Sequence, residues 1–228
     1  MIPLRDSVKS RTFPIVNITI IVLNLLVYLR EVTIEPYRLN QAFYAFGLVP
    51  AEVLNTVFTG APLTPVLVSF VTSMFIHGGW LHVIGNMLFL WVFGDNIEDR
   101  LGHLKYLLFY LAVGVVGGLA HIISNPVSTV PVVGASGAVA GVLGAYIIAF
   151  PRSRILALVP ILIIFTLMEI PAVVFIALWF VLQLFNGVAS LGGAANTVAY
   201  WAHIGGFVMG AILIKTMAPR IVKGYYRP

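Results

Sequence analysis

Two short motifs place a hydroxyl and an imidazole at the beginnings of two apolar stretches. Ser136 lies in a Gly-Ala-Ser-Gly run at 134–137, and His203 lies in an Ala-His-Ile-Gly-Gly run at 202–206. A serine hydroxyl is a weak nucleophile until a neighbouring base takes its proton, and histidine is the usual base near neutral pH. The pair therefore predicts a serine nucleophile, if the fold brings the two side chains within hydrogen-bond reach.

Two more polar residues begin another apolar stretch. His82 and Asn86 are four residues apart, so they share one face of a helix. A polar side chain inside an apolar span is costly, although a single serine or asparagine commonly does no more than hydrogen-bond a neighbouring helix. Four such side chains at one depth favour a functional site over helix packing alone.

The composition identifies the elements that must carry these side chains. Of the 228 residues, 60% are hydrophobic and only 9% are charged, whereas about a quarter of the residues in a soluble domain are charged. The mean hydropathy is +1.02. The chain is therefore expected to be a multi-span membrane protein in a lipid bilayer. Its basic residues lie beside apolar stretches and form no stripe, so nucleic-acid binding is not expected.

Six apolar stretches approach the roughly 20 residues that a helix needs to cross a membrane. We therefore expect an all-α membrane protein, a single domain over 1–228 with a six-helix transmembrane bundle. Of the 13 lysines and arginines, only Arg30 and Arg38 fall outside the segments that would face the cytoplasm, so both termini are predicted to be cytoplasmic. The predicted spans lie near 13–30, 80–100, 104–124, 135–150, 170–188 and 200–218.

Two regions fit this count less simply. The segment 31–79 is too long for a bare connector and contains several prolines, so it is predicted to be a structured external loop. Within it, the apolar residues 66–76 are expected to be interfacial or partly embedded. The apolar residues 155–168 are predicted to be re-entrant or interfacial, because a full span there would put Ser136 and His203 on opposite sides of the membrane.

Glycines give a way for the two motifs to meet. Gly137, Gly141 and Gly144 follow Ser136 as a stripe of small residues, and Gly206 and Gly210 follow His203 with GxxxG spacing. Small residues let helix backbones approach closely. We expect the two helices to pack against each other through these stripes.

Taken together, these motifs resemble those of the rhomboid intramembrane serine proteases over almost the whole chain. The resemblance rests on a Phe-Ile-His run at 75–77 followed by His82 and Asn86, on Ile-Glu-Asp-Arg-Leu-Gly at 97–102, and on the two runs around Ser136 and His203. It implies that Ser136 is the nucleophile and His203 the general base, a dyad without an acidic third member. It also implies that His82, Asn86 and the backbone N–H of Ser136 form an oxyanion hole.

One position departs from the family pattern. Family members often place an aromatic ring four residues after the nucleophile, where it stacks on the base, but this chain has Ala140 there. The sequence leaves open what orients His203, with Tyr200 and Trp201 as nearby candidates. Trp179 and Gln183 are expected to line a lateral gate for the substrate, beneath a cap formed by 187–199.

Other hydrolase classes fit less well. His77, His103 and His121 lack metal-ligand spacing and no HExxH motif is present, so no metal or other cofactor is expected. Ala138 replaces the last glycine of a GxSxG elbow and no strand precedes it, which argues against a soluble α/β hydrolase.

The predicted function is therefore that of an intramembrane serine endopeptidase. It would cut single-pass membrane proteins in or near their transmembrane segments, close to the extracytoplasmic face of a prokaryotic plasma or inner membrane. The alternative is a catalytically inactive rhomboid-like protein that binds or escorts membrane helices. The sequence gives neither the physiological substrate nor the oligomeric state.

Overall fold

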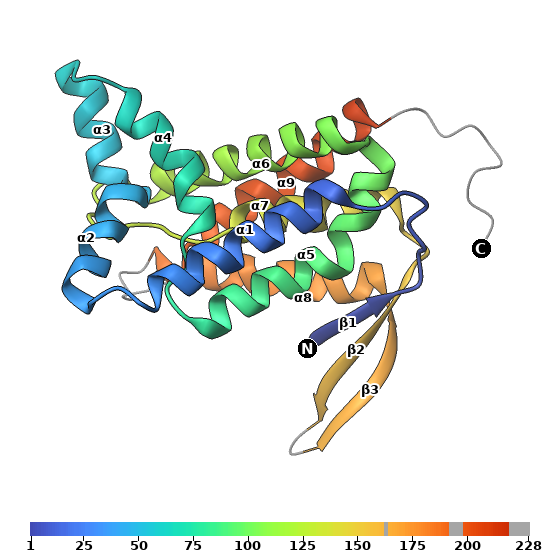
Figure 1. The fold of residues 1–228 in the computed structure, drawn as a ribbon. Helices are drawn as coiled ribbons and strands as arrows, with labels where there is room; N and C mark the ends of the chain where they lie inside the picture. The colour runs from blue at the N-terminus through green and yellow to red at the C-terminus, as the bar shows by residue number, and fades with distance from the viewer. Residues whose placement is uncertain (162–163, 192–197, 219–228) are drawn as a thin grey trace.

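The computed structural model describes residues 1–161, 164–191 and 198–218, which are mainly helical (Figure 1). The elements, in chain order, are β1 (Ile2–Asp6), α1 (Ile15–Glu31), α2 (Pro36–Phe46), α3 (Pro50–Thr59), α4 (Thr64–Thr72), the 3-10 turn η1 (Ser73–Phe75), α5 (Trp80–Leu101), α6 (His103–Ser124), α7 (Ser136–Ala149), β2 (Arg154–Ile161), β3 (Ile164–Pro171), α8 (Ala172–Ser190) and α9 (Tyr200–Met217).

Length and composition support fewer membrane crossings than the six predicted. Over the described ranges, α6 and α8 are long and apolar enough to span a bilayer, and a third crossing is obtained if Thr64–Phe75 and Trp80–Leu101 form one span bent by 85°. Helix α7 is apolar but has only 14 residues. The six-span topology and the cytoplasmic termini stay predictions, and residues 219–228, with three of the basic residues used to orient the chain, lie outside the described part.

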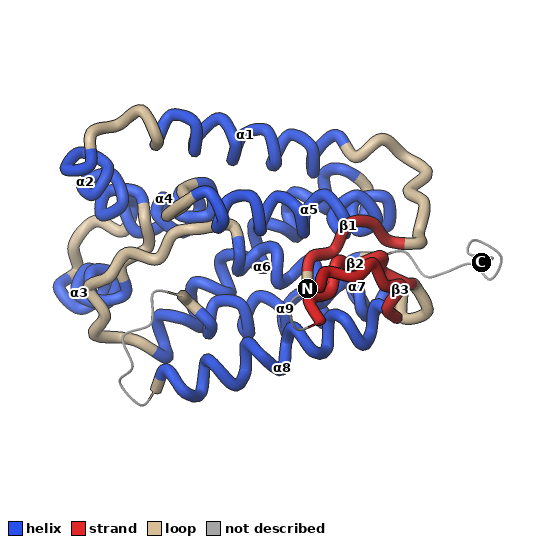
Figure 2. Tube along the Cα trace, turned by 90° about the horizontal axis from the view of Figure 1, so that it is seen from below, coloured by secondary structure: helices blue, strands red, loops and turns tan. Residues whose placement is uncertain are grey.

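Helix α7 occupies the middle of the bundle, in contact with α5, α6, α8 and α9, while α1 and α8 lie on opposite outer sides (Figures 1 and 2). Every residue of α7 from Gly137 to Tyr146 is buried. A helix that touches neighbours on all sides has no need of a polar face. This explains why its sequence is apolar all round apart from its first residue, Ser136.

The backbones of α7 and α9 touch. A Cβ atom added at Gly210 would lie 2.6 Å from the carbonyl carbon of Gly141, and one added at Gly206 would lie 2.9 Å from that of Gly137. Only glycine leaves room for such an approach. The predicted packing of the two glycine stripes is confirmed, and it brings the beginnings of α7 and α9 together.

At one end of the bundle, the buried carboxylate of Glu98 in α5 holds α1 and α6 by hydrogen bonds. It accepts hydrogen bonds from the backbone N–H groups of Val16 (2.9 Å) and Asn17 (2.7 Å) in the first turn of α1, and from Nδ1 of His103 (2.5 Å) at the start of α6. The first N–H groups of a helix lack partners within the helix, and the helix dipole favours a negative charge there. Glu98 therefore joins the ends of α1, α5 and α6.

The segment 31–79, which is predicted as an external loop, contains α2, α3, α4 and η1. Leu48 and Val132 exchange two backbone hydrogen bonds of 3.0 and 2.9 Å, and the N–H of Gly134 donates to the carbonyl of Ser73 at 2.8 Å. These bonds hold the loop against the segment that leads into Ser136.

The fold is mainly helical, as predicted, but it also contains a three-stranded antiparallel sheet that the all-α prediction missed. Strand β2 pairs with β1 on one side and with β3 on the other. Of the residues 155–168 that are predicted as re-entrant or interfacial, 155–161 and 164–168 therefore lie in the paired strands of a β-hairpin. The hairpin projects sideways from the end of the bundle opposite α2 and α3 (Figures 1 and 2). The segment is rich in β-branched residues, and Pro160 would disrupt a helix. Strand β1 pairs only with 155–158, so among the described residues β2 has no strand partner on that edge at Pro160, which lacks an N–H donor.

Candidate active site

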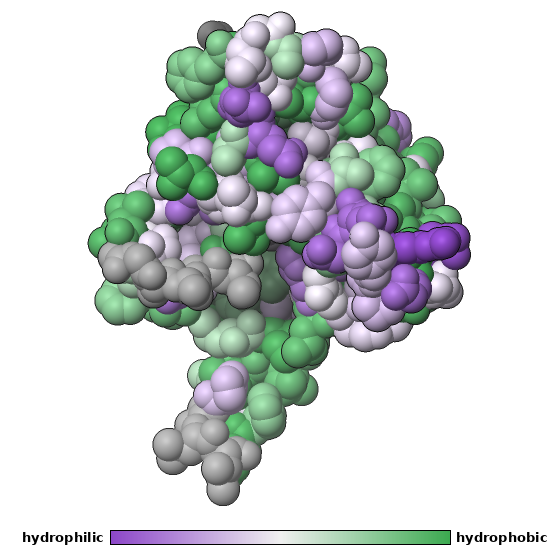
Figure 3. All heavy atoms as spheres, turned by 90° about the vertical axis from the view of Figure 1, so that its left-hand side faces the viewer, coloured by the Kyte–Doolittle hydropathy of each residue, from purple (hydrophilic) through white to green (hydrophobic). Residues whose placement is uncertain are grey.

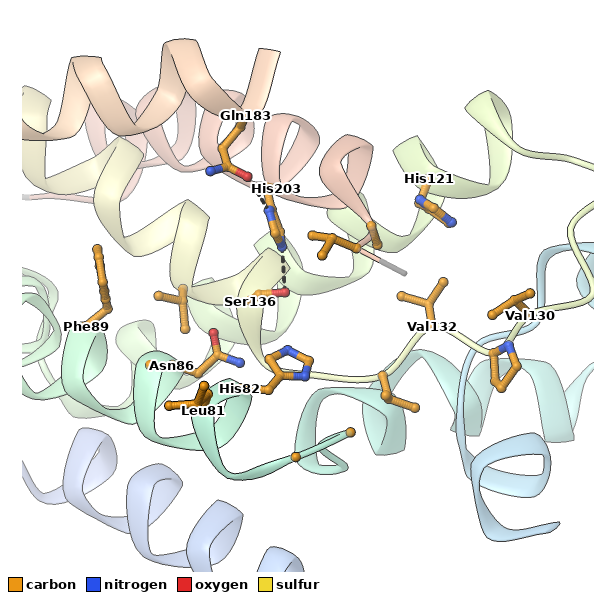
Figure 4. A pocket seen from close by; sticks show the side chains of 18 of the residues that line it. Leu81, His82, Asn86, Phe89, His121, Val130, Val132, Ser136, Gln183 and His203 are labelled. Atoms are coloured by element: carbon orange, nitrogen blue, oxygen red, sulfur yellow. Dashed lines mark hydrogen bonds between the residues drawn. The ribbon is translucent and has the colours of Figure 1, made fainter. Parts of the chain in front are cut away.

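Ser136 and His203 lie opposite each other where α7 and α9 begin. The distance from Ser136 Oγ to His203 Nε2 is 2.7 Å (Figure 4). Ser136 is the first residue of α7, and His203 is in the first turn of α9 with only 8% of its surface exposed. The structure thus brings together the two residues that the sequence predicted as a pair, at hydrogen-bond distance.

The pair opens into a cavity of about 880 Å³ that is lined by residues of α5, α6, α7, α8 and α9 and by the segment before α7. Figure 3 faces the end of the molecule that carries α2 and α3, whose surface is hollowed near its centre. The polar side chains that line the cavity include those of His82, Asn86, His121, Ser136, Gln183 and His203.

The two predicted oxyanion donors, His82 and Asn86, line the same cavity as Ser136 (Figure 4). The backbone of Gly134 passes directly beside the ring of His82, since a Cβ added there would lie 2.6 Å from His82 Cε1. Its φ of 119° also favours glycine. The first glycine of the serine motif therefore leaves the room that the ring of His82 occupies beside the site.

His77 has a role that the sequence did not reveal. Its Nε2 accepts a hydrogen bond from the side-chain amide of Asn86 at 3.0 Å, and its backbone N–H donates to the carboxylate of Glu31 at 3.3 Å. The ring of His82 lies edge-on to that of His77, with centroids 5.0 Å apart. An amide NH₂ has two hydrogens, so Asn86 keeps one donor for another partner. The first histidine of the family-like motif thus fixes Asn86.

His203 is held by a residue that the sequence placed only near a gate. Its Nδ1 lies 2.8 Å from the side-chain oxygen of Gln183 on α8 (Figure 4). The rings of Trp179 and Tyr200 lie farther away, with centroids 6.1 and 6.2 Å from that of His203. The buried indole nitrogen of Trp201, the other candidate, has no hydrogen-bond partner among the described residues. The only advance signal for Gln183 was a polar residue in an apolar helix.

The remaining predictions concern the surroundings of this site. Trp179 and Gln183 both line the cavity, whereas much of the cap expected over 187–199 lies outside the described residues, which omit 192–197. Within the described ranges, no cluster of three or more histidine, aspartate or glutamate side chains has the arrangement of a metal site. His103 pairs with Glu98 at the other end of α5, and His121 lines the cavity.

The fold consists of apolar helices around a cavity that contains a Ser–His pair. The class of protein is therefore a helical membrane protein with a serine–histidine site. The model of the Rhomboid domain matches residues 65–220, which is more than half of the chain. The chain belongs to the rhomboid family.

Several curated relatives carry the family name. Rhomboid protein 1, mitochondrial, of Saccharomyces cerevisiae is 29% identical over 149 residues, 64% of this chain and 40% of the yeast protein. In Bacillus subtilis, the putative rhomboid protease YdcA is 32% identical over 77 residues (34% of this chain, 38% of YdcA). Rhomboid protease GluP from the same organism is 40% identical over 74 residues (32% of this chain, 14% of GluP). The matches thus cover well under half the length of each of these relatives.

Proposed function

We propose that this chain is an intramembrane serine endopeptidase with Ser136 as nucleophile and His203 as general base. The observation that carries the proposal is the 2.7 Å contact between Ser136 Oγ and His203 Nε2, at the wall of a cavity between helices. Named proteases among the relatives support the same class of reaction.

The geometry suits a two-step acyl transfer. Ser136 Oγ forms a bond to the carbonyl carbon of the scissile peptide while its proton passes to His203 Nε2. Collapse of the tetrahedral intermediate breaks the carbon–nitrogen bond, and the imidazolium gives its proton to the leaving amine. Water then attacks the acyl-enzyme, His203 takes a proton from the water, and Ser136 recovers its hydrogen as the ester bond breaks.

Negative charge develops on the carbonyl oxygen in both steps. Asn86, whose amide has a second hydrogen besides the one given to His77, and His82 line the same cavity as Ser136, the first residue of α7. The first N–H groups of a helix have no partner within the helix. Preorganised donors of this kind typically contribute about 2.7 to 4 kcal/mol each to the transition state. We assign His82, Asn86 and the Ser136 N–H to this role.

The substrate that fits best is a single-pass membrane protein. The cavity lies between apolar helices, and Trp179 and Gln183 of the peripheral helix α8 line its side, where we place the lateral gate. A peptide bond inside a helix is shielded by its own hydrogen bonds, so segments with small residues, glycine or proline should be cut most readily. With the positive-inside orientation, this cut falls near the extracytoplasmic face of a prokaryotic plasma or inner membrane.

The test is cleavage of a model transmembrane substrate by protein reconstituted in lipid vesicles, together with labelling by a fluorophosphonate probe. Ser136→Ala and His203→Ala should each lose at least about a thousandfold in kcat. Ser128→Ala and His121→Ala are matched controls, because these residues line the same cavity, and both should cleave at rates close to wild type. Equal cleavage by all five proteins would refute the proposal. A wild-type protein that binds the substrate but neither cuts it nor takes the label would instead be an inactive relative.

A further inference from the structure

We infer that Gln183 is a positioning residue for His203: its amide oxygen holds the Nδ1–H of the imidazole, so that Nε2 is left to accept the proton of Ser136. This inference rests on the proposed function, since it assigns a role to a neighbour of the proposed base. It also answers the question raised by Ala140, where the aromatic ring expected to support the base is missing.

The two contacts of the imidazole are complementary. Gln183 Oε1 lies 2.8 Å from Nδ1, and Ser136 Oγ lies 2.7 Å from Nε2. A neutral imidazole carries its hydrogen on one nitrogen and a lone pair on the other, and an amide oxygen can only accept. The opposite tautomer would set the Nδ1 lone pair against the amide oxygen. Gln183 therefore selects the tautomer that a general base toward Ser136 requires.

The glutamine is itself oriented. Its side-chain NH₂ donates to the carbonyl of Trp179 one turn earlier on α8, at 3.4 Å, which turns the amide oxygen toward His203. The ring of Trp179 lies over the same region, tilted by 32° to the imidazole. Trp179 and Gln183 together set where the amide oxygen of Gln183 lies relative to Nδ1 of His203.

The other polar side chains of α8 show that this contact is not the ordinary way to satisfy a polar group in an apolar helix. Asn186 donates to the carbonyl of Leu182, and Ser190 donates to that of Gly187, both within α8. Across the described residues, the bond from Gln183 to His203 is the one side-chain hydrogen bond that α8 makes to another helix. Gln183 thus reaches across to the imidazole, while its neighbours bond their own backbone.

A neutral acceptor also suits this depth. A carboxylate, which performs the same task in soluble serine proteases, is costly within an apolar span. An amide oxygen fixes the tautomer without a charge, although it cannot neutralise the imidazolium that forms during catalysis. This combination predicts a correctly oriented but slow base.

The test compares Gln183→Met with Asn186→Leu. Methionine has nearly the shape of glutamine but lacks the oxygen acceptor, and Asn186→Leu removes a polar group one turn away that does not touch His203. For Gln183→Met we expect kcat and the rate of fluorophosphonate labelling to fall by about 10- to 100-fold with KM within about twofold, less than the roughly 10⁴-fold loss from a wrong tautomer in a soluble triad. Asn186→Leu should retain wild-type values.

A second readout does not depend on cleavage. Solid-state ¹⁵N NMR of histidine-labelled protein in vesicles, with His203→Ala to assign the signals, should show Nδ1 of His203 protonated in the wild type and a mixture of tautomers in Gln183→Met. An unchanged tautomer, or wild-type cleavage and labelling rates in Gln183→Met, would overturn the inference. A wild type that shows the expected tautomer but no cleavage or labelling would refute the proposed function and leave the role of Gln183 in orienting His203 standing.

Discussion

Gly210→Ala adds one methyl group where the backbone of α9 lies against that of α7. The new Cβ would lie 2.6 Å from the carbonyl carbon of Gly141 and 2.7 Å from its Cα. The carbonyl oxygen of Gly141 would lie closer still. Carbon atoms in contact are normally about 3.5 Å apart or more, so the two helices must separate locally by at least about 0.9 Å. The backbone of Gly141 cannot rotate away from the new methyl group, as the end of a flexible side chain could.

Two effects follow from this separation. Overpacking of a buried contact typically costs about 1 to 3 kcal/mol, and we expect the upper part of that range because the obstacle is backbone. The Ser136–His203 contact of 2.7 Å joins the same two helices. If it opened by the same amount, it would reach at least about 3.6 Å, beyond the range of a hydrogen bond.

The assay is thermal unfolding in detergent, followed by tryptophan fluorescence, together with the rate of fluorophosphonate labelling. Gly210→Ala should unfold several degrees below wild type and label more slowly. Gly85→Ala in α5 is the stability control, because outside its chain neighbours and the backbone of its own helix no described atom lies within 4 Å of the added Cβ. Alanine there should be neutral or stabilise by up to about 1 kcal/mol through helix propensity. Identical unfolding temperatures and labelling rates in wild type and Gly210→Ala would refute the reasoning.

Three other predictions concern regions away from the cavity. Glu98→Ala leaves one buried and one part-buried N–H group without an acceptor and should cost about 3 kcal/mol in chemical denaturation. Glu169→Ala, which removes an exposed ion pair, should cost less than about 1 kcal/mol. Equal losses would contradict this prediction. Burial raises the pKa of Asp6 from 3.8 to about 6. The folded protein therefore binds the carboxyl proton of Asp6 more tightly than the unfolded chain does, and stability falls as pH rises from about 4 to about 6. Asp6→Asn should flatten the curve of unfolding temperature against pH. An unchanged slope would show that other groups cause the pH dependence. Because the chain has no cysteine, a single spin label on Leu167→Cys in β3 reports the depth of the hairpin in the membrane. If the hairpin is interfacial, oxygen should relax the label more strongly than a water-soluble nickel complex does. The reverse order would place the hairpin in water.

The proposed catalytic residues could be found from the sequence because each one stands out locally. Ser136, His203, His82 and Asn86 are polar residues at the beginnings of apolar helices, where such residues are costly, and the structure places all four around one cavity. The glycine stripes were equally informative, since close backbone contact is the ordinary result of small residues at helical spacing.

Gln183 and the hairpin could not be predicted in the same way. In the sequence, Gln183, Asn186 and Ser190 are three similar polar residues of one apolar helix, and only the placement of α8 beside α9 distinguishes the first. A short apolar run such as 155–168 reads equally well as helix or strand. Its partner β1 lies about 150 residues away in the chain, so no local pattern could reveal the pairing.

Two contacts support His203: the backbone contact between α7 and α9, and the side chain of Gln183. The first is stiffer than the second, and a double variant separates their contributions to the rate of labelling. Backbone contact with α7 fixes where α9 lies, whereas Gln183, a partly buried side chain on peripheral α8, fixes how the ring is turned. Both act on the same proton transfer from Ser136. Once Gly210→Ala has opened that contact, the orientation of the ring matters less, so adding Gln183→Met should slow labelling by less than the product of the two single effects. A fully multiplicative loss would show that the two supports act on different steps.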